Sequence, residues 1–195
     1  MARFVYWMNV SLDLFIERSP SADFSGDWLS IDEGLHREFN ERARRLSMMV
    51  EGRLMYDQMN PFWPDARHDR TLPDYLREFG EIWTAMPKVL VSRTRATASH
   101  NTTVFGGGDA LDRLAELRRT ETGDIGVGGA TLATALLRRG LLDELLLFSH
   151  PVVLGTGRPL FDELDEPLPL DLLEEKSFAS GVSMHRYAVR TRPDD

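Results

Sequence analysis

The sequence contains no cysteine among its 195 residues. This excludes disulfides, cysteine nucleophiles, iron–sulfur centres and thiolate metal sites, and it makes a cytoplasmic setting the default expectation. Long apolar runs are also missing, since no stretch approaches the roughly 20 residues that cross a bilayer. The N-terminus lacks the layout of a signal peptide. We therefore expect a cytoplasmic protein that does not enter membranes.

Recognised metal and nucleotide motifs are scarce. The five histidines are scattered without HExxH or paired spacing, so we expect no metal site. There is no Walker A lysine and no G-x-S-x-G elbow. The formal net charge of −8 argues against binding to nucleic acid. Any anion site on this chain has to be local. Lys88 and Lys176 are the only lysines, so the basic residues are nearly all arginine. Arginine suits bidentate phosphate recognition, and biased genomic base composition is the alternative explanation.

What is present is an ordinary globular composition, with 42% hydrophobic and 28% charged residues. The length is enough for one substantial core, so we expect a single domain over residues 1–190 and a polar tail over 191–195. Apolar runs alternate with stretches of helical periodicity. Strands are predicted at 3–10, 47–51, 87–92, 102–105, 124–127, 145–148, 169–178 and 182–190; helices are predicted at 32–46, from 52, from 73, at 109–119 and at 131–139. Residues 11–30 and 60–72 are predicted to be irregular.

This order predicts an α/β protein. Strands that alternate with helices favour a mostly parallel sheet, and the two strands after residue 168 favour an antiparallel C-terminal hairpin at its edge.

The most informative motif is Asp124-Ile-Gly-Val-Gly-Gly-Ala-Thr, where a short strand ends in glycines and a helix begins at once. Such a turn points bare backbone N–H groups and a helix N-terminus at a phosphate. It departs from the dinucleotide fingerprint G-x-G-x-x-G, because Thr131 occupies the last position. A standard Rossmann site is therefore not expected, and a tight turn without a ligand is the alternative interpretation.

Two further turns carry groups suited to anions. Gly52-Arg53 lies where a strand meets a helix, and Ser92-Arg93 follows the strand at 87–92. A solvated arginine explains each turn alone equally well. Parallel strands bring their carboxyl ends to one edge, however, so three such turns together favour a phosphate-bearing ligand.

Taken in order, these segments resemble one family. They are Ser11-Leu-Asp13, Gly52-Arg-Leu-Met-Tyr, Pro87–Arg93, Asp124–Leu132, Gly140-Leu-Leu-Asp-Glu and Pro151–Phe161. The set resembles the dihydrofolate-reductase-like family that includes the reductase domain of the bifunctional riboflavin-biosynthesis deaminase-reductase. The resemblance implies a three-layer α/β/α fold, NADPH as hydride donor, and a flat heterocycle or its ribityl derivative as substrate. A 5-amino-6-(5-phosphoribosylamino)uracil reductase is the implied type.

The resemblance also implies roles for particular residues. Those that hold the cofactor diphosphate are Gly128, Gly129, Ala130 and Thr131. Those near the adenosine 2′-phosphate, which distinguishes NADPH from NADH, are Arg53 after Gly52, with Ser92 and Arg93.

Three carboxylates are candidates for the catalytic site. By resemblance, Asp13 and the loop after it border the nicotinamide and the substrate. Asp32 and Glu33, where the first helix begins, are positional candidates for assisting proton transfer. Acidic residues are favoured at helix starts in any case, so a capping role for these two remains the alternative.

Two positions depart from the family pattern. Leu14 replaces the usual glycine after the aspartate of Ser-Leu-Asp, and Met55 replaces a threonine that would offer a hydroxyl to phosphate. The zinc deaminase half needs cysteines, so we expect a stand-alone reductase-type domain. A non-catalytic nucleotide- or flavin-binding protein and a purely structural module remain the alternatives. The resemblance further suggests a homodimer through the C-terminal strands.

Overall fold

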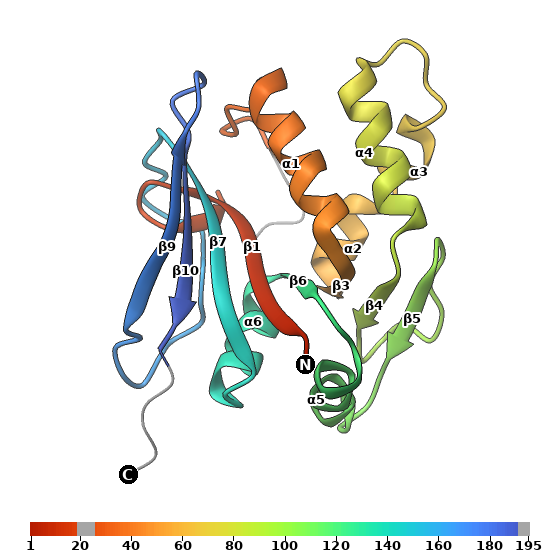
Figure 1. The fold of residues 1–195 in the computed structure, drawn as a ribbon, viewed down its shortest axis with the longest axis vertical. Coiled ribbons are helices and arrows are strands. Elements are labelled where there is room, and N and C mark those ends of the chain that lie inside the picture. Colours follow the sequence, from red (N-terminus) through yellow and green to blue (C-terminus); the bar gives the residue numbers. More distant parts are fainter. Residues whose placement is uncertain (19–25, 191–195) are drawn as a thin grey trace.

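The computed structural model describes residues 1–18 and 26–190 and contains one eight-stranded sheet (Figure 1). The strand order is β5-β4-β3-β6-β1-β7-β10-β9. The first six strands are mutually parallel, and β10 runs antiparallel to both of its neighbours. The bounds are β1 Arg3–Ser11, β3 Leu46–Gly52, β4 Lys88–Val91, β5 Thr102–Phe105, β6 Asp124–Gly128, β7 Leu142–His150, β9 Leu170–Ser177 and β10 Ser183–Val189. The predicted parallel sheet with an antiparallel edge hairpin is confirmed.

Helices cover both faces of the sheet. One face carries α1 (Glu33–Arg45), α2 (Arg53–Met59), α3 (Trp63–Ala66) and α4 (Asp74–Ala85), with α1 and α4 side by side (Figure 1). The other face carries α5 (Ala110–Thr120) and α6 (Ala130–Arg138). Successive side chains of a strand point to opposite faces, so Val5 of β1 joins the core under α1 while Phe4 and Tyr6 join the core under α6. The result is the expected three-layer α/β/α architecture.

Three details differ from the sequence prediction. The strand predicted at 145–148 is longer, because Glu144 within β7 is buried with ion-pair partners and its charge does not end the strand. A short helix, α3, lies inside the predicted loop 60–72. A separate two-stranded sheet joins β2 (Phe15–Glu17) to β8 (Arg158–Pro159). Strands this short carry no periodicity that a sequence pattern can reveal.

Parts of the expected irregular segment 11–30 and all of the predicted tail lie outside the described residues. Among the residues that are described, no helix combines the length and hydrophobicity needed to cross a bilayer.

A ring of four charges ties the hairpin to the parallel strands. Arg3 and Arg186 each bind both Asp124 and Glu144. These residues come from β1, β10, β6 and β7 respectively. The Glu144 side chain is only 5% exposed, so its charge depends on these two guanidinium groups for compensation.

His150, the last residue of β7, fastens the segment before α1. Its Nδ1 accepts a hydrogen bond from the Ser30 backbone N–H at 2.9 Å, and its Nε2 lies 3.0 Å from Asn9 Oδ1. An Nε2–H tautomer satisfies both partners, since an amide oxygen only accepts. Burial lowers the pKa of His150 to about 4. The neutral imidazole is therefore the form that the fold accommodates.

The ion-pair ring predicts a non-additive stability effect. Replacing Arg186 with Met removes one partner of a buried carboxylate, and we expect a loss of about 3 kcal/mol in the free energy of unfolding. Adding Glu144→Leu should restore much of that loss, because the uncompensated charge is gone. Urea denaturation of the two single variants and of the double variant measures the effect. If the double variant loses as much stability as the two single variants together, the ring does not act as a unit.

His150 predicts a pH effect of defined sign. Its folded pKa of about 4 lies below the ordinary 6.5, so the unfolded chain binds more protons between these values. The contribution of His150 is complete above pH 6.5 and is lost as pH falls toward 4, by about 2 to 3 kcal/mol. In His150→Asn this part of the acid dependence should disappear in denaturant titrations. An unchanged slope would contradict the assignment.

Candidate functional site

The carboxyl edge of the parallel strands gathers the predicted site residues. In the sheet register Glu51 of β3 pairs with Gly128 of β6, and Gly52 pairs with Val91 of β4. The turns that follow β3, β4 and β6 therefore leave the sheet side by side. Ser11 ends β1 at the same edge, because β1 is parallel to β6. In open α/β sheets, ligands bind at such an edge.

The glycine turn after β6 lies beside the end of β3. Gly129 has φ +106°, a left-handed conformation that favours glycine. A Cβ built on Gly129 would lie 3.8 Å from Gly52 N, and one on Gly52 would lie 3.7 Å from Gly128 O. The side chain of Met55 covers the turn from α2, since a Cβ on Gly128 would lie 2.9 Å from Met55 Cγ. The turn thus presents backbone, with Met55 as one wall.

The N-terminus of α6 opens directly onto this turn. Gly129 is its N-cap residue and offers no side-chain hydrogen bond to the first N–H groups. The helices α2 to α5 also begin without a side-chain cap, whereas Asp32 caps α1, where its Oδ1 accepts from Leu35 N–H at 2.8 Å. Uncapped N–H groups and the positive end of the helix dipole favour an anion. Of the residues predicted here, Gly128 and Ala130 are buried, whereas Thr131 is exposed.

Arg158 lies beside this helix start and was not among the predicted site residues. It donates from Nη2 to Thr131 Oγ1 at 2.7 Å and also pairs with Asp162. Its neighbour Gly157 has no room for a side chain, because a Cβ there would lie 1.9 Å from Glu17 O of β2. The small β2–β8 sheet therefore fixes Arg158 at the site. The Gly-Arg pair in the segment 151–161 was the only sequence signal for it.

The turns after β3 and β4 form a second, basic part of the site. Arg53, at the start of α2, pairs with Asp57 at 3.0 Å, and Arg95 pairs with the same carboxylate at 2.6 Å. Arg93 is exposed and makes no ion pair within the described residues. Sequence reasoning singled out Arg53 and Arg93 but missed Arg95, whose contact with Asp57 joins two turns far apart in the chain.

Ser92 organises the turn after β4 from inside. Its buried Oγ accepts hydrogen bonds from Thr94 N–H at 3.2 Å and Arg95 N–H at 3.0 Å. The hydroxyl predicted to lie near a phosphate is thus engaged with the backbone, where it shapes the turn that presents the two arginines.

Asp13 is held by three hydrogen bonds. Ser11 Oγ donates to its Oδ1 at 2.6 Å, and the backbone N–H groups of Leu154 and Gly155 donate at 3.0 and 2.8 Å. The bond from Ser11, followed by those from the backbone, lowers the pKa of Asp13 to about 2. At neutral pH this carboxylate carries no proton, and it fastens the loop after β7 to the end of β1.

The other two predicted carboxylates lie where α1 begins, at the same edge of the sheet. Asp32 is half-buried and uses Oδ1 to cap the helix. Glu33 is exposed and pairs with Arg37 at 2.8 Å. The capping interpretation describes Asp32, and its Oδ2 makes no hydrogen bond within the described residues. A role for either residue in proton transfer stays a prediction.

A buried carboxylate that the sequence did not indicate lies beneath the site. Glu51 precedes Gly52 and accepts from Trp83 Nε1 at 3.3 Å, while its second oxygen lacks a partner within the described residues. Desolvation raises its pKa to about 7. Lys88 lies in the same core, donates to the backbone carbonyls of Trp83 and Met86, and has its pKa lowered to about 8 by burial.

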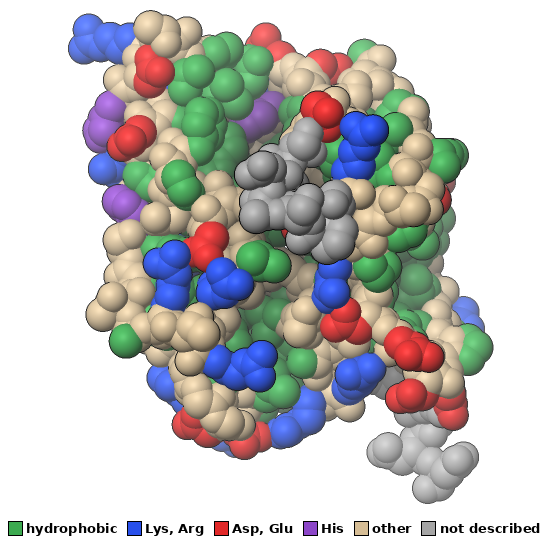
Figure 2. Space-filling view, turned by 180° about the vertical axis from the view of Figure 1, so that it is seen from behind, with side chains coloured by type: hydrophobic (Ala, Val, Ile, Leu, Met, Phe, Trp, Pro, Cys, Tyr) green, Lys and Arg blue, Asp and Glu red, His purple; other side chains and the backbone are tan. Residues whose placement is uncertain are grey.

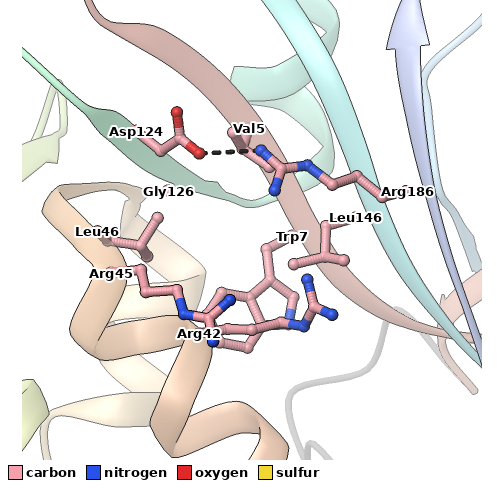
Figure 3. Close-up of a pocket in the computed structure, with 9 residues that line it drawn as sticks. All are labelled: Val5, Trp7, Arg42, Arg45, Leu46, Asp124, Gly126, Leu146 and Arg186. Atoms are coloured by element: carbon pink, nitrogen blue, oxygen red, sulfur yellow. Dashed lines mark hydrogen bonds and ion pairs between the residues drawn. The ribbon is translucent and has the colours of Figure 1, made fainter. Parts of the chain in front are cut away.

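Charged side chains of both signs are mixed on the face of the molecule that Figure 2 shows, with Lys and Arg over its middle and lower part and Asp and Glu among them. A pocket of about 60 Å³ lies at the amino ends of the strands, where Arg42, Arg45 and Arg186 surround Trp7 (Figure 3). Arg42 and Arg186 are each bound to two carboxylates. Most of this charge therefore holds α1 and β10 to their neighbours.

Comparisons with known proteins agree with this architecture. The uncharacterized protein YyaP of Bacillus subtilis is 29% identical over 92% of this chain and 91% of its own length. RibD of Acinetobacter baumannii superposes with a TM-score of 0.69 at 17% identity, over 98% of this chain and 59% of the RibD chain. A deaminase/5-amino-6-(5-phosphoribosylamino)uracil reductase of Thermotoga maritima gives a TM-score of 0.62 at 12% identity, over 97% of this chain and 57% of that one.

The family model for the RibD C-terminal domain matches residues 5–184. This range runs from β1 into β10 and includes all three turns of the candidate site. The chain therefore belongs to the RibD C-terminal domain family.

Proposed function

We propose that this chain is an NADPH-dependent reductase that transfers hydride to a pterin-like or ribitylamino-pyrimidine-like heterocycle. One observation carries the proposal: α6 begins on Gly129, which has φ +106° and offers no side-chain cap, beside the end of β3. Membership of a family whose reductases typically use a nicotinamide cofactor supports it.

The glycine turn fits a diphosphate. The first N–H groups of α6 lack side-chain partners, and Gly129 adds no atoms to the surface that an anion would approach. Thr131 supplies a hydroxyl and Arg158 a guanidinium beside it. A positive charge next to a helix N-terminus favours phosphoryl oxygens. We therefore assign the diphosphate to residues 128–131.

The basic turns fit an additional phosphate. Arg53 and Arg93 come from turns that leave the sheet next to each other, and Arg95 lies with them. NADPH differs from NADH by the 2′-phosphate, so an arginine cluster beside the adenosine would favour NADPH. The planar guanidinium group of arginine matches phosphate geometry better than the ammonium group of lysine does. The basic residues of these two turns are all arginines.

The cofactor would supply the hydride, and the protein would orient the reactants and exclude water. Asp13 fixes the loop 154–155 against β1 and leaves proton delivery to another group, because it is ionised at neutral pH. Asp32 is the better placed of the remaining candidates. It is half-buried at the carboxyl edge, and one of its oxygens is not used by the cap.

A non-catalytic nucleotide- or flavin-binding protein on the same scaffold is the second candidate. Two observations favour it: Met55 packs over the glycine turn, and Leu14 stands 49% exposed at φ +62° where the family has glycine. Such a protein would bind nucleotide but would not oxidise NADPH with any pterin or ribityl-pyrimidine. A substrate screen with spectrophotometric detection of NADPH separates the two candidates.

We also propose a homodimer through β9. Within residues 1–18 and 26–190 this edge strand has no partner on one side, and Leu172 and Leu173 are each 52% exposed. Exposed strand edges with apolar side chains tend to pair with another chain. Light scattering should show a dimer that Leu172→Arg with Leu173→Arg converts to a monomer, whereas Leu12→Arg leaves it intact. A monomeric wild type would contradict this assembly.

The arginines predict cofactor preference. Tryptophan-fluorescence titration should show tighter binding of NADPH than of NADH. The double variant Arg53→Ala, Arg93→Ala should weaken NADPH binding about 10- to 100-fold, because charge-assisted bonds to phosphate contribute about 1.5 to 3 kcal/mol, and it should leave NADH binding nearly unchanged.

Arg139→Ala is the matched control, since this exposed arginine pairs with Asp112 on the α5–α6 side of the sheet. It should leave both affinities unchanged. Equal affinity of the wild type for NADPH and NADH would contradict the roles of Arg53 and Arg93. Binding of neither nucleotide would overturn the proposed function.

A further inference from the structure

Asp57 occupies the position between two arginines of the candidate phosphate site. Its Oδ2 lies 3.0 Å from Arg53 Nη1, and its Oδ1 lies 2.6 Å from Arg95 Nη2. Both arginine side chains are 46% exposed, and the Asp57 side chain is 26% exposed. Each arginine thus binds a different oxygen of one carboxylate, at a place that solvent can reach.

The helix α2 and the turn after β4 hold these three side chains in position. Arg53 and Asp57 lie one turn apart on α2, and residues four apart on a helix face the same way. The Ser92 hydroxyl binds the Arg95 backbone N–H and so holds the turn from which Arg95 reaches across. The carboxylate therefore neutralises part of the charge that the turns after β3 and β4 bring together.

We propose that Asp57 is a specificity-determining residue that competes with the 2′-phosphate of the nucleotide for Arg53 and Arg95. This inference rests on the proposed function, and it goes beyond it by predicting that the chain's own carboxylate weakens NADPH binding. NADH carries no 2′-phosphate, so Asp57 does not compete with it for the two arginines. Asp57 therefore reduces the ratio of the affinity for NADPH to the affinity for NADH.

Charge decides the direction of the effect. The two arginines and Asp57 together carry a net charge of one unit, whereas a phosphate monoester carries about −1.5 to −2. Removing the carboxylate raises the attraction and also removes a like charge at short range. Asp57 also orients the two arginines, but exposed ion pairs contribute little. Loss of repulsion should therefore outweigh loss of orientation.

Asp57→Asn tests the proposal because it removes the charge and keeps the shape. We expect NADPH to bind about 5- to 10-fold more tightly than to the wild type, with NADH affinity unchanged within about twofold. The difference should shrink at high salt, because the arginines are exposed. Asp57→Glu retains the charge and should stay close to the wild type.

Two further variants complete the design. Asp112→Asn removes an exposed carboxylate that pairs with Arg139 elsewhere on the surface, and it should change neither affinity. Arg95→Ala should weaken NADPH and leave NADH unchanged, which tests the arginine that the proposal adds. Circular dichroism and thermal melts of each variant confirm that the fold is intact.

The outcomes distinguish a failure of the proposed function from a failure of the role proposed for Asp57. If the wild type and all variants bind neither nucleotide, the proposed function fails and this inference fails with it. If the wild type binds both nucleotides but Asp57→Asn leaves the ratio of affinities unchanged, or weakens NADPH, only the role of Asp57 is overturned. The second result would make Asp57 a residue that positions the arginines.

Discussion

The left-handed turn at Gly129, beside the end of β3 at Gly52, is the constraint on which the site depends. Parallel pairing of β3 with β6 brings the ends of both strands to the same level. The chain then turns into α6 through Gly129 at φ +106°, a backbone conformation that L side chains rarely adopt. A Cβ at Gly129 would meet the end of β3 at ordinary contact distance, so backbone conformation rather than lack of space favours glycine there. The start of α6 is left as bare backbone, and the basic turns after β3 and β4 stand beside it.

Carboxylates at both ends of the sheet bind the neighbouring strands and loops to one another. At the amino end, Asp124 and Glu144 bind Arg3 and Arg186 and join the hairpin to the parallel strands. At the carboxyl end, Asp13 holds the loop after β7. Each of these carboxylates is engaged in hydrogen bonds or ion pairs within the fold. This division suits a protein that positions a reactive cofactor and leaves the bond-making to it.

The sequence predicts the scaffold well and the contacts of the site poorly. Strand and helix positions follow from periodicity, and the glycine turn follows from Gly126-Val-Gly-Gly. The partners of Ser92 and Arg158 do not, because they are set by tertiary structure. A serine after a strand carries no sign of whether its hydroxyl faces a ligand or its own backbone. Arg158 meets Thr131 only because β2 and β8 pair, and neither strand is long enough to show a pattern.

The central claim is that the backbone N–H groups of residues 128–131 hold the diphosphate of a pyridine nucleotide. A crystal structure of the protein grown in saturating NADPH tests it most directly. The account predicts density for the diphosphate against the first turn of α6, with the adenosine end toward Arg53. A nucleotide bound elsewhere, or a well-ordered turn with no nucleotide on it at saturation, would contradict the claim and leave only the fold.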